Sequence, residues 1–265
     1  MGDLGALRLT LRSMERVVVA FSGGADSAFL AFVAHDTLGA ERVVALTAVS
    51  PSLAPEEYAD CEALAREWGM RWEPVETTEL ESAMYVANGT DRCFHCKTAL
   101  MDVAAPVAAR EGDAIVVLGV NVDDLGDHRP GQAAASSRGA AFPLVDAGFT
   151  KDDVRAVSRS LGLRTWDKPA AACLASRIPY GTPVTVSLLS GVARAESGLR
   201  RLGFRDLRVR HYGDVARVEV GVDELESVIA LREQVVAAVK AGGYAYVTLD
   251  LEGFRSGNLN GGLPR

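Results

Sequence analysis

Residues 17–27 read VVVAFSGGADS, and this stretch decides the fold. The run at 17–21 is mostly β-branched, as in a buried strand, and it stops at the glycine pair Gly23-Gly24. From Asp26 onward, apolar residues recur at helical spacing. Two glycines let the backbone approach an anion closely, and N–H groups at a helix N-terminus supply positive potential. The stretch therefore predicts a strand–loop–helix unit that binds phosphate.

The hexamer SGGADS at 22–27 carries the groups that such a loop needs. Ser22 and Ser27 add hydroxyl donors to the backbone N–H groups. Asp26 lies in the first helical turn, where its carboxylate either stabilises the helix dipole or holds a Mg²⁺ ion on ATP phosphates. The loop has neither the GxxxxGK[ST] pattern of a Walker A motif nor the GxGxxG pattern of a dinucleotide site. An ordinary glycine-rich turn is the alternative interpretation.

Two further apolar runs, at 42–49 and 114–120, and a short strand expected at 72–75 alternate with helical patterns in the first half of the chain. Continuous apolar strands separated by helices predict an α/β fold, a parallel sheet with helices on both faces. Asp123 and Asp124 follow the run at 114–120, at the sheet edge where such folds bind ligands. They either hold Mg²⁺ and orient a nucleotide or open the loop as an Asx turn.

The chain is predicted to have two domains joined by a connector. The segment 168–183 contains three prolines and a glycine, which is typical of an extended linker. We therefore place an ATP-binding domain at 1–167 and a smaller α+β domain at 184–265. The second domain reads as a helix at 186–202, a hairpin turning at Gly213, a helix at 222–241 and a final strand.

Composition excludes several classes of protein. The 265 residues are 48% hydrophobic and 24% charged, which is typical of a globular chain rather than a disordered one. A net charge of −7 argues against a nucleic acid partner or an anionic membrane surface. The N-terminus lacks an apolar stretch long enough for an export signal or membrane span, and four cysteines are too few for a disulfide scaffold. We expect a cytoplasmic protein.

Cys93 and Cys96 form a C-x-x-C pair, which alone is compatible with a redox pair, with half of a zinc site or with chance. His95 or His128 would have to complete a zinc site. Cys173 lies in the connector, where a small buried residue is the ordinary alternative to a reactive thiol. Cys61 lies in a helical pattern and is interpreted as a packing residue.

Arginines concentrate in the second domain of this acidic chain. Arg208 and Arg210 alternate along a predicted strand and so point to one face. Because a guanidinium grips phosphate through paired hydrogen bonds, we predict that these two and Arg255 bind a substrate phosphate. Glu196 is predicted as a nearby Mg²⁺ ligand.

At SGGADS the sequence resembles the PP-loop ATP pyrophosphatases, which cleave ATP between the α and β phosphates. Further segments resemble one branch of that superfamily, the LarE family of ATP-dependent sulfur transferases. These segments are DRCFHCK (91–97), NVDDLGDHRPG (121–131), KPAAACLASRIPYG (168–181), RVRHYGDVARVEV (208–220) and GFRSGNLN (253–260).

The resemblance implies a definite reaction. A ring carboxylate of pyridinium-3,5-biscarboxylic acid mononucleotide is adenylated, and sulfur then displaces AMP to leave a thiocarboxylate. Two rounds give the dithio precursor of the nickel-pincer nucleotide. Adenylation is needed because a free carboxylate is a poor electrophile. The resemblance also implies a homo-oligomer.

The resemblance implies the following cofactors and site. ATP and Mg²⁺ are required, and Cys173 handles the sulfur. Cys93, Cys96 and Cys173 either hold a [4Fe-4S] cluster with one open iron, which we favour, or Cys173 alone is a sacrificial donor. A tRNA thiolase and a non-catalytic nucleotide-binding protein are the remaining alternatives. The residues assigned to the ATP site are Ala20, Ser22, Gly23, Gly24, Asp26, Ser27, Ala48, Gly119 and Asp124.

Overall fold

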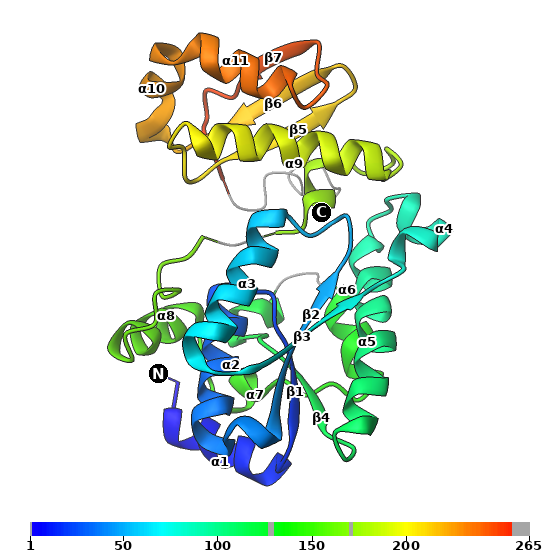
Figure 1. Cartoon of the computed structure of the whole chain (residues 1–265), viewed down its shortest axis with the longest axis vertical. Helices are drawn as coiled ribbons and strands as arrows, with labels where there is room; N and C mark the ends of the chain where they lie inside the picture. Colours follow the sequence, from blue (N-terminus) through cyan, green and yellow to red (C-terminus); the bar gives the residue numbers. More distant parts are fainter. Residues whose placement is uncertain (1, 127–129, 170–171, 256–265) are drawn as a thin grey trace. The chain divides into compact units, whose positions relative to one another are not determined.

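The computed structural model describes residues 2–126, 130–169 and 172–255 (Figure 1). The chain divides into two compact units. Unit 1 comprises Met1–Ser50, Glu57–Tyr85 and Thr90–Ala171; unit 2 comprises Pro51–Glu56, Val86–Gly89 and Ala172–Arg265. Unit 2 therefore begins inside the predicted connector and takes in two short segments from the first half of the chain.

Unit 1 is built on a four-stranded parallel sheet in the order β3-β2-β1-β4. Its strands are β1 (Val17–Ala20), β2 (Val43–Val49), β3 (Arg71–Glu76) and β4 (Ile115–Leu118). The chain runs outward from β1 to β3 and then crosses to the other side of β1 to form β4. The carboxyl ends of β1 and β4 thus flank the point where strand order reverses, which is where open α/β sheets bind ligands. The predicted parallel α/β sheet is confirmed.

Both faces of this sheet are covered because its central strands are apolar on both sides. Val17 and Val19 belong to one buried cluster, whereas Val18 belongs to the other. The first face packs against α1 (Leu4–Met14), α2 (Ala25–Leu38) and α8 (Lys151–Ser160), and the second against α5 (Arg92–Arg110) and α6 (Pro130–Ser136). The period of two along a strand explains this division.

The remaining elements of unit 1 are short apart from α3. They are η1 (Ala40–Arg42), α3 (Pro55–Trp68, mostly in unit 1), η2 (Glu79–Glu81), α4 (Ala83–Val86, ending in unit 2), η3 (Val122–Gly126) and α7 (Pro143–Asp146). Helix α8 begins with a reciprocal capping box that Thr150 and Asp153 form. Helix α5 begins at Arg92, so Cys93 and Cys96 both lie on it.

Unit 2 contains a three-stranded sheet in the order β5-β6-β7, with strands β5 (Arg208–Tyr212), β6 (Val215–Glu219) and β7 (Tyr246–Leu249). The first two strands form the predicted antiparallel hairpin, in which Gly213 adopts a φ of +63°, and β7 pairs parallel to β6. Helix α9 (Val186–Arg201) packs against α11 (Arg232–Lys240). The single helix predicted at 222–241 is wrong: the segment is broken into η5 (Val222–Glu224), α10 (Leu225–Ala230) and α11.

One buried asparagine fixes the connector within unit 2. Asn88 has a φ of +55° and is fully buried. Its Nδ2 donates to the carbonyl oxygens of Ile178, Pro179 and Thr182 at 3.3, 2.8 and 2.9 Å. The backbone that follows η4 (Leu174–Arg177) is held in place by these bonds. Among the described residues, no helix is long and apolar enough to span a bilayer.

Candidate functional site

The loop between β1 and α2 has the geometry of an anion cradle. Gly23 has a φ of +70°, a conformation that favours glycine, and Gly24 is the N-cap of α2. No side chain caps that N-terminus, so the first-turn N–H groups are not taken by a capping oxygen. The Ser22 and Ser27 hydroxyls lie 3.0 Å apart, and Ser27 Oγ accepts from the Ser22 N–H at 3.3 Å. Backbone and hydroxyl donors therefore converge on one loop.

Two glycines near the loop lie so close to neighbouring atoms that a side chain would collide with them. A β-carbon added at Gly23 would lie 2.9 Å from Cys61 Sγ, and one added at Gly119 would lie 2.8 Å from the backbone nitrogen of Ser27. The end of β4 thus passes directly against the first turn of α2. Cys61 is fully buried, and burial raises the pKa of its thiol to about 11. It packs beneath the loop, as the sequence predicts.

A carboxylate pair lies at the same edge of the sheet. Burial raises the pKa of Asp26 above its ordinary range, and the negative charge of Asp124 adds to the rise. A hydrogen bond from Asn121 lowers this pKa but does not cancel the effect of burial. Asn121 and Asp124 exchange two backbone-to-side-chain hydrogen bonds of 3.2 and 3.3 Å. Lys151 Nζ lies 3.2 Å from Asp124 Oδ1. Two carboxylates and an amide oxygen are a donor set that suits Mg²⁺.

Asp123 has a different place from its neighbour. Its Oδ2 accepts from the Lys151 backbone N–H at 2.8 Å, at the start of α8. Asp124 is buried, whereas Asp123 is exposed. Of the two carboxylates singled out by the sequence, Asp124 is the one that interacts electrostatically with Asp26.

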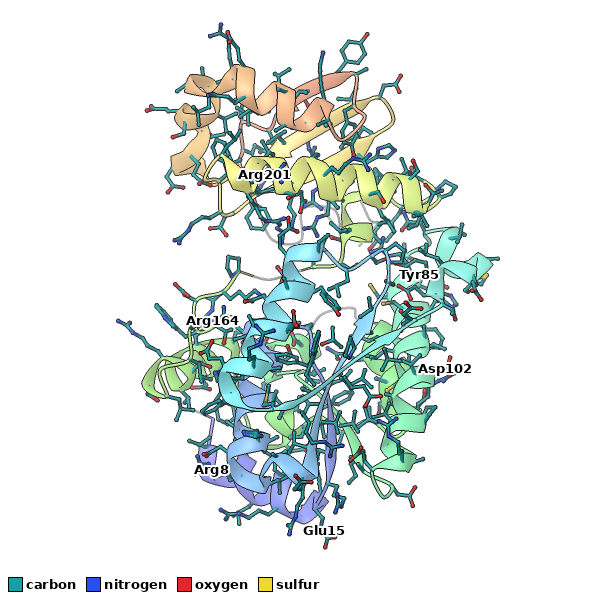
Figure 2. All side chains as sticks on the ribbon, in the orientation of Figure 1. Arg8, Glu15, Tyr85, Asp102, Arg164 and Arg201 are labelled. Atoms are coloured by element: carbon teal, nitrogen blue, oxygen red, sulfur yellow. The ribbon has the colours of Figure 1, made fainter. Side chains whose placement is uncertain are left out.

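Sequence reasoning did not single out Lys168, which lies beside the loop. Its Nζ is 2.7 Å from Glu57 Oε2 and 2.6 Å from Asp60 Oδ2, both on α3. Asp60 also pairs with Arg164, which is labelled in Figure 2, at 2.6 Å. A β-carbon on Gly23 would lie 3.6 Å from Lys168 Nζ. The Lys168 ammonium group thus lies beside the phosphate loop, paired with carboxylates more than a hundred positions earlier in the sequence.

Cys93 and Cys96 lie three residues apart near the start of α5, with the first exposed and the second half-buried. His95 Nε2 is 3.2 Å from Asp91 Oδ2. Cys173 belongs to unit 2 and immediately precedes η4. Within the described residues no group of three His, Cys, Asp or Glu side chains is placed to hold a metal. His128, a predicted alternative zinc ligand, lies outside the described residues.

The backbone at Cys173 is tied to a buried ion pair in unit 2. Arg177 Nη1 donates to the carbonyl oxygens of Ala172 and Cys173 at 2.6 and 3.0 Å. Its other guanidinium nitrogens bind the Glu196 carboxylate at 2.8 and 3.0 Å. Glu196 also accepts from Arg200 and from the Val209 N–H. Glu196 thus binds two arginines next to the connector. Its role as a Mg²⁺ ligand stays a prediction.

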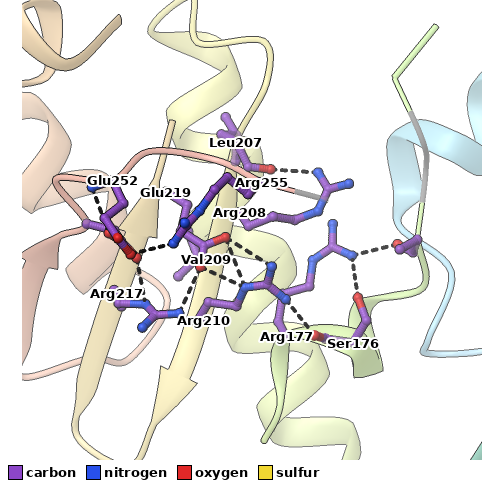
Figure 3. Close-up of polar contacts among 12 residues, drawn as sticks. Ser176, Arg177, Leu207, Arg208, Val209, Arg210, Arg217, Glu219, Glu252 and Arg255 are labelled. Carbon is purple, nitrogen blue, oxygen red and sulfur yellow. Dashed lines mark hydrogen bonds and ion pairs between the residues drawn. The ribbon is translucent and has the colours of Figure 1, made fainter. Parts of the chain in front are cut away.

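Buried arginines gather on the hairpin of unit 2 (Figure 3). Arg210 makes three hydrogen bonds of 3.0–3.1 Å to Glu219 and donates to the Ser176 carbonyl oxygen at 2.9 Å. Arg208 donates to the Leu207 carbonyl oxygen, and its guanidinium carbon lies 4.9 Å from the Phe254 ring centroid. Burial, with the positive charge of Arg177, lowers the pKa of Arg208 to about 10. A nearby anion would stabilise the charged form of this guanidinium.

Comparisons with known proteins show the family of this chain. Residues 7–105 match the NAD synthase family. An uncharacterized protein from Synechocystis sp. is 45% identical over 256 residues, covering 96% of this chain and 95% of that protein. The pyridinium-3,5-bisthiocarboxylic acid mononucleotide synthase of Lactiplantibacillus plantarum is 38% identical over 258 residues, or 96% of this chain and 92% of that protein. The chain belongs to the LarE family. A 23% identical uncharacterized protein of Methanocaldococcus jannaschii covers 91% of this chain.

Membership of the LarE family makes the chain an enzyme of the PP-loop class and implies that it uses ATP. Unit 1 contains all of the residues predicted for the ATP site: Ala20, Ser22, Gly23, Gly24, Asp26, Ser27, Ala48, Gly119 and Asp124. They lie at the carboxyl ends of β1, β2 and β4, in the loops that follow these strands, or in the first turn of α2 and in η3. The predicted substrate-phosphate ligands belong to unit 2, where Arg208 and Arg210 are buried, whereas Arg255 is exposed and pairs with Glu252.

Proposed function

We propose that this enzyme adenylates the carboxylates of pyridinium-3,5-biscarboxylic acid mononucleotide and converts them to thiocarboxylates in the biosynthesis of the nickel-pincer nucleotide. The observation that carries the proposal is the uncapped glycine loop at the sheet's switch point, with Asp26 and Asp124 at the same edge. The 38% identical Lactiplantibacillus protein, whose name gives the bisthiocarboxylic product, supports the substrate.

In the first step a substrate carboxylate oxygen attacks the α-phosphorus of ATP. The α,β-bridging bond breaks, pyrophosphate leaves, and an acyl-adenylate forms. Donors on Ser22, Gly23, Gly24 and Ser27 hold the phosphates, while the backbone at Ala20, Ala48 and Gly119 encloses the nucleotide. Asp26 and Asp124 would hold a Mg²⁺ ion, which neutralises phosphate charge.

In the second step sulfur attacks the activated carbonyl carbon, and AMP leaves with the bonding electrons. Cys173 is the sulfur-handling residue in this proposal. Arg177 fixes the carbonyl oxygens of residues 172 and 173 and so orders the backbone that carries the thiol. Arg208, Arg210 and Arg255 hold the substrate phosphate, a role that suits their charge and forked geometry.

The source of the sulfur has two forms within the same proposal. A [4Fe-4S] cluster held by Cys93, Cys96 and Cys173 would supply sulfide repeatedly. Cys93 and Cys96 lie together on α5, and Cys173 belongs to the other unit. In the alternative, Cys173 gives up its own sulfur and is left as dehydroalanine.

Single-turnover assays test the proposal. The chain is incubated anaerobically with ATP, Mg²⁺ and the pyridinium dicarboxylate mononucleotide, and AMP, pyrophosphate and thiocarboxylate are quantified. We expect Cys173→Ala to release pyrophosphate but to form no thiocarboxylate. Thiocarboxylate formation by that variant would refute the role of Cys173, and wild-type enzyme that releases no pyrophosphate would refute the proposal.

The same samples distinguish the two sulfur sources. Iron and acid-labile sulfide in the anaerobic protein, with an unchanged intact mass after turnover, would support the cluster. Loss of the mass of H₂S, localised to Cys173, would support the sacrificial route.

A further inference from the structure

The side chain of Lys168 is mostly withdrawn from water, with 17% of its surface exposed, and its charge is held between two acids. Glu57 Oε2 and Asp60 Oδ2 accept hydrogen bonds from Nζ at 2.7 and 2.6 Å. Burial alone would lower the pKa of this lysine, but the hydrogen bonds to the two carboxylates and their negative charges together outweigh burial and raise it. The group is therefore a fixed cation.

The cation lies against the glycine that opens the phosphate loop. The missing β-carbon of Gly23 would come within 3.6 Å of Lys168 Nζ, and within 2.9 Å of Cys61 Sγ. A larger residue at Gly23 would therefore come between the loop and the ammonium group. Gly23 thus leaves the ammonium within direct reach of the loop backbone, where an anion bound to that loop would lie.

We propose that Lys168 is a ligand for the phosphate tail of ATP, and that Glu57 and Asp60 hold it in place until the nucleotide displaces them. The inference rests on the proposed use of ATP at this loop. The tail carries several negative charges and accepts charge-assisted hydrogen bonds as well as a carboxylate does. When ATP binds, Nζ gives up a bond to a carboxylate and donates to a phosphate oxygen, without proton transfer.

This assignment predicts opposite effects from the two sides of one ion pair. Removing the lysine charge weakens binding of the phosphate tail, whereas removing the charge of Glu57 strengthens it, because the tail no longer competes with that carboxylate. If this ion pair had only a structural role, either change would only lower the stability of the protein. Glu57 is the better choice for substitution, because Asp60 also pairs with Arg164.

Calorimetric titrations measure the effect on α,β-methylene-ATP with Mg²⁺, on inorganic pyrophosphate and on AMP. For Lys168→Met we expect about 10- to 100-fold weaker binding of the first two ligands, the range for loss of one charged hydrogen bond, and unchanged AMP binding. For Glu57→Gln we expect severalfold tighter binding of the analogue. Lys168→Arg should recover part of the loss.

Arg66→Met is the matched control, because Arg66 lies on the same helix and pairs only at the surface with Glu62. It should leave all three affinities unchanged. The inference is overturned if Lys168→Met binds the analogue as the wild type does, or if Glu57→Gln weakens it; the second test holds even if Lys168→Met does not fold. Failure of the wild type to bind the analogue would instead refute the proposed use of ATP.

Discussion

Replacing Glu196 by glutamine should destabilise unit 2 more than any surface substitution. The carboxylate is completely buried, and its two oxygens accept from Arg177, Arg200 and the Val209 N–H. Burial opposes its ionisation, but the charge and hydrogen bonds of Arg177, together with the charges of Arg200 and Arg208, outweigh burial and lower the pKa of Glu196. Glutamine has nearly the same shape but is neutral, and its NH₂ would face guanidinium donors. The variant thus leaves the buried Arg177 charge without its counter-charge.

The expected cost follows from the burial of both partners. The side chain of Arg177 is 3% exposed, so water cannot replace the lost carboxylate. Removing one partner of a buried ion pair costs about 3–5 kcal/mol. For a chain of this size, about 2–4 °C of melting temperature is lost per kcal/mol, so the shift should be roughly 6–20 °C.

Thermal and urea unfolding, followed by near-UV circular dichroism, measure this loss. Glu252→Gln is the matched control, because Glu252 pairs with Arg255 at the surface and its loss should cost less than about 1 kcal/mol. Since Arg177 also holds the carbonyl oxygen of Cys173, we expect iodoacetamide to alkylate Cys173 faster in Glu196→Gln. The reasoning fails if Glu196→Gln melts no lower than the control.

Other predictions concern the loop, the metal edge and the arginines. Gly119→Ala should displace the first turn of α2, because the new methyl group would lie 2.8 Å from Ser27 N; we expect about 1–3 kcal/mol lower stability in urea melts and weaker ATP binding by calorimetry. Because the pKa of Asp26 is raised, ionisation of this carboxyl opposes folding as pH rises through that pKa, and protons compete with Mg²⁺ as pH falls toward it. Asp26→Asn should therefore stabilise the metal-free protein at neutral pH in melts, yet abolish Mg²⁺-dependent pyrophosphate release. Inorganic phosphate at about 100 times its Kd should stabilise the wild type by about 2.7 kcal/mol, and in Arg208→Met the shift should vanish at the same concentration.

The sheet and the loop could be predicted because their signals are local. The run at 17–21 is mostly β-branched and a glycine pair follows it closely, so these residues predict a strand and its end without reference to distant parts of the chain. The helices between the strands predict that the sheet is parallel, because a parallel connection needs a long crossover, but they do not predict the order of the strands. Thr150 and Asp153 likewise specify the start of α8 from residues three apart.

Other features depend on contacts between distant parts of the chain, and sequence patterns do not contain them. Lys168 meets Glu57 across 111 positions, and Asn88 meets Pro179 across 91. Neither residue lies in a motif for the contact that it makes. The break between α10 and α11 was missed because the segment 222–241 contains no proline and its glycines come only after it, at 242–243.

The buried arginines of unit 2 suit the phosphate site that we propose. Arg177, Arg208 and Arg210 are buried, and the buried carboxylates among them are those of Glu196 and Glu219. Arg177 binds Glu196, and Arg210 binds Glu219, so each of these pairs offsets part of the cost of burying its charges. Burial, with the positive charge of Arg177, lowers the pKa of Arg208 to about 10. A phosphate bound beside Arg208 would favour its charged form, and this is the physical reason for expecting Arg208→Met to lose the stabilisation by phosphate.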